Sequence, residues 1–425
     1  MFCSFIYFLL VAGFKGTYYL IDCIYMETCN HATLAQTVIR ALTDAGVDFN
    51  DVTAFVTDNA PYCIKAYREG LKMILPNSVH VCCLAHILNL VGEVWHHWKE
   101  FAEVATVTNL MKTLFTTQPA RKRRYKAHLA ARNVASPTLP PVPVASRWNT
   151  WFEAVKYHAI HVEHYHSFFM AEASEAQSVL RIIGLLDPEG DSYDNIKLQM
   201  NFIAETCPKL MHTLTTMEAT HTPVATRAYN LIEDCSSFLR NGCHKVVFGD
   251  STDEILAALP RAQRNTHLAI FHNVFQAGFQ KLSKHWDQHP AKDIYKQARI
   301  FDPRRVGTLS DEVGDFGAVG LTDAMRDDFN TYRQAALTDL PRQAEGADFD
   351  LAAYWRGMED RTEEIAAAAQ TYMYFPVSSV DTERSFSKYK NLVTDKRENL
   401  TEENTKQLVI MNFNGDVSGR WADWV

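Results

Sequence analysis

Two acidic residues that lie far apart in the chain, Asp58 and Glu383, occupy the positions best suited to chemistry. Asp58 directly follows the apolar run 52–57, which we interpret as a short buried strand. In open α/β sheets, ligands and catalytic groups gather at the carboxyl ends of such strands. Glu383 falls in the first turn of a helix that Ser379 or Asp381 can cap. The two residues therefore predict the halves of one split active site.

Each of the two carboxylates also has an ordinary structural explanation. Asp58 can make a turn or cap the helix that follows it. Glu383 can simply be favoured by the positive end of the helix dipole, which is worth less than ~1 kcal/mol. Neither residue alone predicts catalysis, so the interpretation depends on the rest of the chain.

Two shorter motifs stand near these carboxylates in the expected fold. Cys83 and His86 are spaced like half of a zinc site, but no second pair with suitable spacing occurs, so we expect a buried thiol and a hydrogen-bonded histidine that pack the start of a long helix. Arg147 and Trp148 either place a cation beside an aromatic ring at a helix start or form a core tryptophan with a solvated arginine.

Basic residues are concentrated in one short run. Five of the six residues from 121 to 126 are basic: Arg121, Lys122, Arg123, Arg124 and Lys126. The run is a candidate for phosphate contact or for a nuclear-import signal, although many charge runs are only solvated helix faces. Arg384 and Lys388 surround Glu383 and are further candidates for contact with a nucleic-acid backbone. Because the net charge of the chain is −8, any DNA binding must depend on such local patches.

Composition indicates a globular protein in a reducing compartment. The chain has 425 residues, of which 47% are hydrophobic and 22% charged, enough for two or three domains. Its nine cysteines are odd in number and form no Cys-x-x-Cys pair, which favours buried thiols over a disulfide framework. Residues 1–12 are apolar, but no basic residue precedes them and they are too short to span a bilayer. We interpret them as a strand rather than a signal peptide, and expect no membrane association.

The elements that must position the site fall into three regions. Residues 1–118 alternate strand and helix signals, with strands expected at 2–12, 17–25, 52–57 and 79–84, and so predict an α/β layer around a mixed sheet. Residues 119–350 have mostly helical patterns, which indicate an all-helical insertion. Residues 351–425 form helices broken at Pro376. The final helix can be capped by Thr401, and its apolar side is formed by Leu408, Val409 and Phe413.

Four segments, in this order, closely resemble transposases of the hAT superfamily. They are TDNAPYCIKAY, CLAHILNLVGEVW, SRWNTW and FPVSSVDTERSFSKYKNLVTDKRENLTEENTKQLV. The resemblance covers roughly residues 17–115, 146–151 and 351–413, and its C-terminal part is the longest pattern. It implies an RNase H-like mixed sheet with helices on both faces, interrupted by a large all-helical insertion and closed by a helical C-terminal dimerisation region.

The resemblance also implies roles for the residues above. In such transposases two aspartates and one glutamate bind two divalent ions, Mg²⁺ or Mn²⁺, which promote phosphodiester cleavage and strand transfer. By position, Asp58 matches the second aspartate and Glu383 the glutamate. Cys83 and His86 match the family's Cys-x-x-His element, and Arg147 with Trp148 its Arg-Trp element.

Two departures from the family pattern shape the expected function. The first aspartate belongs on a strand upstream of residues 2–25, and the usual zinc-finger spacing is not present in the sequence. We therefore expect an N-terminally truncated, transposase-derived nuclear protein that is not an enzyme as it stands. It would retain homodimerisation, with DNA as a further partner. The alternatives are a fragment of an active DDE-type DNA transposase whose true N-terminus lies further upstream, and a helical interaction protein without a DNA role.

Overall fold

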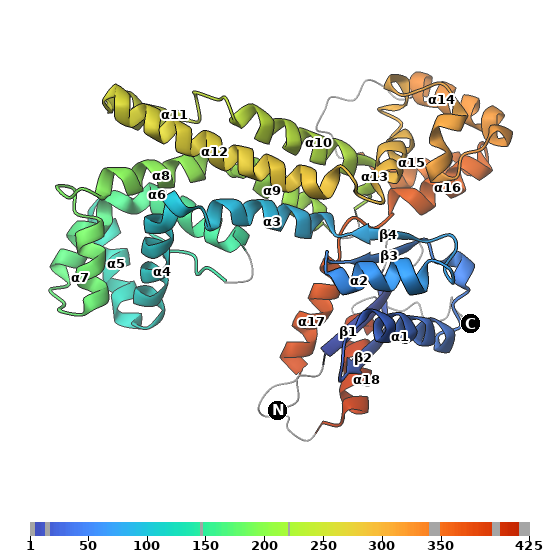
Figure 1. Cartoon of the computed structure of the whole chain (residues 1–425), viewed down its shortest axis with the longest axis horizontal. Coiled ribbons are helices and arrows are strands. Elements are labelled where there is room, and N and C mark those ends of the chain that lie inside the picture. The colour runs from blue at the N-terminus through green and yellow to red at the C-terminus, as the bar shows by residue number, and fades with distance from the viewer. Residues whose placement is uncertain are drawn as a thin grey trace. The chain divides into compact units, whose positions relative to one another are not determined.

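The computed structural model describes residues 5–12, 18–144, 148–219, 222–339, 349–392 and 400–415 (Figure 1). Contacts divide the chain into two compact units. The first comprises residues 1–87, 215–232 and 286–425, and the second comprises residues 88–214 and 233–285. The first unit thus combines segments from both ends of the sequence. The division into domains at residues 118 and 350 stays a prediction.

The described residues of the first unit form four strands in two separate sheets. β1 (Phe5–Ala12) and β2 (Tyr18–Met26) form an antiparallel hairpin, and β3 (Ala54–Thr57) pairs in parallel with β4 (Val79–Cys82). All four strands lie within a few residues of the ranges expected from the sequence. The described residues are mostly helical with little sheet, and a single RNase H-like mixed sheet stays a prediction.

Local sequence explains the helix that precedes β3. α1 (His31–Asp44) begins at Asn30, whose side chain accepts the backbone N–H groups of Ala32 and Thr33, while the Thr33 hydroxyl accepts the N–H of Asn30. This reciprocal cap satisfies donors that would otherwise lack partners. Gly46, with φ of +68°, follows the end of the helix in the left-handed region that glycine tolerates.

The core beside β3 is built from two helical segments. α1 packs against α2 (Pro61–Ala66) and the π-helical turn η3 (Tyr67–Leu71). Gly70 permits this approach, since a Cβ there would lie 2.7 Å from the Cβ of Ala35. Phe55 of β3 packs against this cluster, whose buried members are Leu34, Ala35, Val38, Leu42, Cys63, Ala66, Leu71 and Leu75.

The C-terminal part of the first unit is helical and reaches back to the N-terminal hairpin. Its helices are α13 (Lys292–Ala298), α14 (Arg326–Asp339), α15 (Leu351–Met358), α16 (Glu363–Met373), α17 (Val380–Leu392) and α18 (Glu402–Gly415). The Thr401 hydroxyl accepts the N–H of Asn404, so the predicted cap of α18 is confirmed. α18 packs against β2, which joins segments almost 400 residues apart in the sequence (Figure 1).

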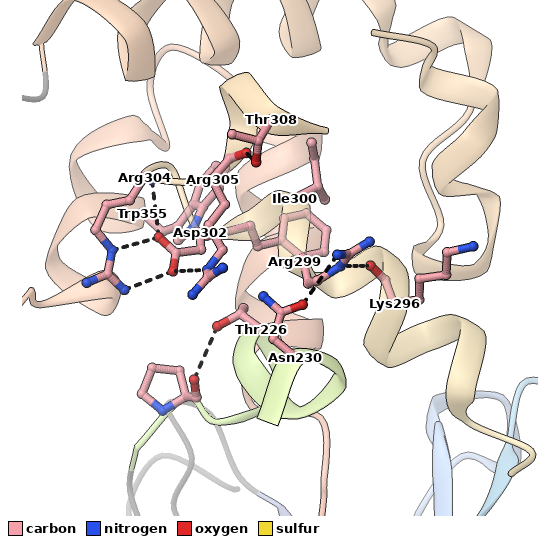
Figure 2. A network of polar contacts seen from close by, with 12 residues as sticks. Thr226, Asn230, Lys296, Arg299, Ile300, Asp302, Arg304, Arg305, Thr308 and Trp355 are labelled. Atoms are coloured by element: carbon pink, nitrogen blue, oxygen red, sulfur yellow. Dashed lines mark hydrogen bonds and ion pairs between the residues drawn. The ribbon is translucent and has the colours of Figure 1, made fainter. Parts of the chain in front are cut away.

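A network of polar contacts fastens the middle of the first unit (Figure 2). Asp302 is 1% exposed, and each of its carboxylate oxygens accepts an N–H from the Arg304 guanidinium at 2.8 Å. Arg299 donates to the side chain of Asn230 at 3.3 Å, and the Trp355 indole donates to the Phe301 carbonyl at 2.8 Å. The network connects the start of α10 (Ala225–Gly242), residues 299–304 and α15.

Among the described residues, the regular elements of the second unit are all helices. They are α3 (Leu84–His96, whose first turn belongs to the first unit), α4 (Ala102–Thr116), α5 (Pro119–Ala131), α6 (Trp148–Ala171), α7 (Gln177–Leu185), α8 (Tyr193–Thr206), α9 (Pro208–Met217, whose residues 215–217 belong to the first unit), α10 (Ala225–Gly242, whose residues 225–232 belong to the first unit), α11 (Asp250–Ala258) and α12 (Arg261–Trp286, whose last residue belongs to the first unit). Its core is aromatic, with the rings of Phe202 and Phe271 stacked at 3.8 Å. Within the described ranges, no helix of either unit is long and apolar enough to cross a membrane.

Candidate functional site

Asp58 lies directly after β3, at the carboxyl end of the parallel strand pair, where the sequence places it. Its side chain is exposed to solvent, and its Oδ1 accepts the N–H of Ala60 at 3.1 Å. The turn that offered the structural explanation of Asp58 is therefore present. One carboxylate oxygen shapes this turn, and solvent reaches the side chain.

Cys83, directly after β4, connects Asp58's strand to the C-terminal segment. Its N–H donates to the Thr57 carbonyl at 2.9 Å. Its sulfur accepts the N–H of His86 at 3.4 Å and the N–H of Ser379 at 3.2 Å. Cys83 is 1% exposed. Its sulfur therefore supplies these two N–H groups with a hydrogen-bond acceptor where water does not.

The segment before α17 is held in place by two further hydrogen bonds. The Tyr295 hydroxyl donates to the Pro376 carbonyl at 2.7 Å, and the N–H of Leu84 donates to the Val377 carbonyl at 2.9 Å. Together with the bond from Ser379 to Cys83, three hydrogen bonds at residues 376, 377 and 379 fix the segment that leads into α17. Sequence spacing gave no signal for these contacts, because they join residues about 80 and 300 positions apart.

Glu383 sits one turn into α17, where its N–H donates to the Ser379 carbonyl at 3.3 Å. Its side chain is exposed. Arg384 does not point freely to solvent, since it pairs with Asp381 at 2.7 Å and donates to the Glu218 carbonyl at 3.0 Å. The side chain of Lys388 lies outside the described residues. Cys83 thus brings together the backbone segments that carry Asp58 and Glu383.

The electrostatics of Cys83 favour a neutral thiol in its present surroundings. Burial raises the pKa of its thiol, the hydrogen bonds from Ser379 oppose this, and the nearby Glu383 carboxylate raises the pKa again. A thiol must lose its proton to bind a metal ion. Cys83 is therefore a neutral hydrogen-bond acceptor at this position, and His86 contributes through its backbone.

The fit of a divalent metal can be judged from the donor groups. Carboxylate oxygens suit Mg²⁺ or Mn²⁺. Nowhere among the residues that the structure describes do three or more histidine, cysteine, aspartate or glutamate side chains gather closely enough to hold a metal ion. Asp58 and Glu383 fit only part of such a site, and we derive no chemical step through a metal.

Two buried histidines, one within β4 and one bonded to it, were not singled out from the sequence. His80 lies 2.8 Å from the Thr57 hydroxyl, and Nε2 of His289 donates to the Cys82 carbonyl at 2.7 Å while its Nδ1 accepts the N–H of Ala291. Burial lowers the pKa of each histidine to about 4. Both rings are neutral near pH 7 and stabilise the strand end rather than exchange protons.

The Arg-Trp motif and the basic run fall within the residue range of the second unit. Trp148 is 3% exposed and packs so closely on α3 that a Cβ at Gly92 would lie 2.1 Å from its ring. This matches the core-anchor interpretation, while Arg147 lies outside the described residues. Within the basic run, Arg121 is buried and pairs with Glu172 at 2.9 Å, and Arg124 pairs with the same carboxylate. Glu172 therefore offsets part of the run's charge. Arg123, Arg124 and Lys126 are exposed, and Lys122 is partly exposed. Of these, Arg124 is engaged by Glu172.

The three residues predicted for dimerisation divide between two sides of α18. Val409 and Phe413 are 0% and 8% exposed and pack against Leu20 and Cys23 of β2 within the chain itself. Leu408 is 37% exposed. Sequence analysis overlooked Met411, which is 69% exposed and lies one turn beyond Leu408.

The comparison with protein families identifies the C-terminal segment. Residues 330–414 match the model of the hAT family C-terminal dimerisation region, which spans most of α14, α15, α16, α17 and nearly all of α18. No curated protein matches the chain. The match supports the resemblance to the hAT family that the sequence motifs carry, and the chain thus contains a region similar to the family's dimerisation region.

Proposed function

We propose that this chain is a hAT transposase-derived protein that associates with a second copy of itself through its C-terminal region. The observation that carries the proposal is the match of residues 330–414 to a dimerisation region. The motifs around Asp58, Cys83 and Glu383 support the same family, since they occur in the family's order in the rest of the chain.

The outer face of α18, defined here by Leu408 and Met411, is the part of this region best suited to contact a second copy. The two residues are three positions apart, so they are neighbours on the helix surface. The opposite side of α18 is already fixed to β2 by Val409 and Phe413. Exposed Asn404 and Gln407 flank the outer face without adding charge. Their amides would need hydrogen-bond partners in a contact with a second copy, but no charge of theirs would have to leave water.

The test compares two double substitutions in the full chain. Leu408→Glu with Met411→Glu places four carboxylates at a two-fold contact and should reduce the mass in solution to that of a monomer. The matched control is Ile160→Glu with Met170→Glu, which changes exposed apolar side chains on α6 and should leave the mass unchanged. If the wild-type chain is a monomer at every concentration, self-association is wrong. If the α18 variant stays associated like the wild type, the contact does not involve the outer face.

A second candidate function is metal-dependent phosphodiester cleavage. It is favoured by the position of Cys83, which bonds the segments bearing Asp58 and Glu383. In this function both carboxylates would supply oxygen ligands to Mg²⁺ or Mn²⁺. Nicking of duplex DNA by the purified chain, lost in Asp58→Asn and in Glu383→Gln, would support it, and no nicking by the wild-type chain with either metal ion would rule it out.

DNA association in the nucleus is part of the same proposal and would depend on Lys122, Arg123 and Lys126. Neutralising three phosphate contacts should reduce the slope of log K against log salt by about 2 to 3. Replacing the three residues by glutamine and measuring fluorescence anisotropy of labelled DNA over a salt series tests this. An unchanged slope would exclude these residues as the contact, and a fluorescent fusion would show whether the same substitutions abolish nuclear accumulation.

A further inference from the structure

The polar network of Figure 2 contains three arginines and one carboxylate, that of Asp302. Arg304 occupies both oxygens of this carboxylate, and its guanidinium carbon lies 5.0 Å from the centre of the Phe349 ring. Arg305 reaches the same carboxylate only at 3.6 Å, which is too long for a hydrogen bond, and its side chain is 44% exposed. Arg304 therefore satisfies Asp302, and the donors of Arg305 stay available.

Arg299 is the arginine of this network that forms no ion pair with any described residue. Its Nε donates to the Lys296 carbonyl at 2.6 Å, and its Nη1 donates to Oδ1 of Asn230 at 3.3 Å. Its guanidinium carbon lies 4.8 Å from the centre of the Tyr229 ring. Partial burial lowers the pKa of Arg299, Tyr229 opposes this, and the charge of Arg305 lowers the pKa further. Two like charges thus lie near each other, and no described carboxylate pairs with both of them.

The side chain of Asn230 supplies an uncharged donor beside these two guanidinium groups. Because its Oδ1 accepts from Arg299, its Nδ2 carries two N–H groups, and no described residue accepts a hydrogen bond from them. In Figure 2 the guanidinium groups of Arg305 and Arg299 flank the Asn230 amide. The three side chains thus offer several N–H donors and two positive charges within one small region.

The number and arrangement of these donors suit a phosphate group. A carboxylate has two oxygens, which a single guanidinium fork can occupy, as Arg304 does with Asp302. Two forks and an amide match the larger, tetrahedral set of oxygens in phosphate. The backbone is also fixed in advance, since the N–H of Asp302 donates to the Arg299 carbonyl at 3.1 Å and that of Arg305 to the Asp302 carbonyl at 2.9 Å.

We propose that Arg299, Arg305 and the Asn230 amide bind a phosphate group, either a backbone phosphate of DNA or a free phosphate compound. Arg304 and Asp302 hold the segment in place and do not contact the ligand. Binding removes the repulsion between the two arginines, so the ligand stabilises the folded chain. This inference is independent of self-association, and its test with pyrophosphate is independent of the DNA association proposed above.

Thermal unfolding of the full chain in increasing pyrophosphate, at constant ionic strength, tests the site. A ligand that binds only the folded chain raises the melting temperature as its concentration rises. Arg305→Gln should need at least about tenfold more pyrophosphate than the wild type for the same rise, because hydrogen bonds to a charged group are lost. The matched control is Arg356→Gln, which removes a half-exposed arginine of the same unit and should respond like the wild type.

A second variant, Asn230→Asp, places a carboxylate beside both arginines without changing the shape of the side chain. In the absence of ligand it should raise the melting temperature, because it pairs with two charges that repel each other. It should also abolish the response to pyrophosphate, because the new carboxylate occupies the donors. A lower melting temperature than that of the wild type would contradict the repulsion, and a response equal to that of the wild type would contradict the site.

Labelled duplex DNA distinguishes the two sources of phosphate. If the ligand is the DNA backbone, Arg305→Gln should weaken DNA binding and reduce the slope of log K against log salt by about 1, whereas Arg356→Gln should change neither. If Arg305→Gln weakens the pyrophosphate response and leaves DNA binding unchanged, the ligand is a free phosphate compound. The proposal is overturned if Arg305→Gln changes neither the pyrophosphate response nor the binding of DNA.

Discussion

Two sets of polar groups in the first unit differ in their burial and in their hydrogen-bond partners. Asp302, His80 and His289 are nearly enclosed, and each has specific hydrogen-bond partners. Asp58 and Glu383 are exposed, and Glu383 uses only its backbone to hold its position. The buried groups stabilise the fold, whereas the two exposed carboxylates remain open to solvent, apart from the one Asp58 oxygen that accepts the N–H of Ala60. This second arrangement is the one that a ligand-binding group requires.

The largest effect should come from acid, through the buried histidines. Their pKa of about 4 lies below the ordinary value near 6.5, so the unfolded chain binds protons more tightly than the folded one. Their stabilising contribution is complete above about pH 6.5 and is lost as the pH falls toward 4, at about 3 kcal/mol for each ring. Urea unfolding over this pH range measures the loss.

The glutamine variant of His289 isolates one of these contributions. A glutamine side chain does not titrate, but its amide can still donate to the Cys82 carbonyl. The His289→Gln chain should lose less unfolding free energy between about pH 6.5 and 4.5 than the wild type. Equal losses in the two proteins would show that His289 does not control acid stability.

Removing the buried carboxylate should have the next largest effect. Asp302→Asn leaves Arg304 without its ion pair and should lower the unfolding free energy by about 2 kcal/mol, less than for a fully enclosed pair because Arg304 reaches solvent. Thermal unfolding followed by circular dichroism provides the measurement. A melting temperature equal to that of the wild type would mean that the network in Figure 2 does not stabilise the unit.

A smaller effect is expected at Cys83. Cys83→Val fills a similar volume but leaves the N–H of Ser379 without an acceptor, at a cost of about 1 to 2 kcal/mol. Cys83→Ser keeps an acceptor and should be less destabilising. Denaturant titration of both variants compares them, and a valine variant as stable as the serine variant would show that the sulfur acts only as packing.

The exposed carboxylates should have the smallest effect on stability. Asp58→Asn keeps a side-chain oxygen for the Ala60 N–H, and Glu383→Gln removes no described contact of the side chain. Both should change the unfolding free energy by less than about 0.5 kcal/mol. If either variant lost as much unfolding free energy as Asp302→Asn in the same titration, the exposed carboxylates would stabilise the fold as much as the buried groups do.

Local patterns were sufficient to locate the pieces of the candidate site. The apolar run before Asp58 predicts β3, the spacing of apolar residues predicts the helices, and Thr401 predicts the cap of α18. Each of these signals depends on residues within a few positions of one another.

Long-range partners were not predictable in the same way. Nothing near Cys83 in the sequence indicates that its sulfur accepts the N–H of Ser379, and nothing near Arg121 indicates that Glu172 neutralises it. Apolar periodicity shows that α18 has an apolar side. It does not distinguish Val409, which β2 covers, from Leu408, which is partly open to solvent. The partner that covers each group decides its role, and that partner lies in a distant part of the chain.

The most direct test of the central claim is the mass of the wild-type chain in solution. One copy has a mass of 48.3 kDa. Light scattering coupled to size-exclusion chromatography should give twice this value, and the Leu408→Glu with Met411→Glu variant should return it to that of one copy. A wild-type chain that keeps the mass of one copy at all concentrations would contradict self-association through the C-terminal region.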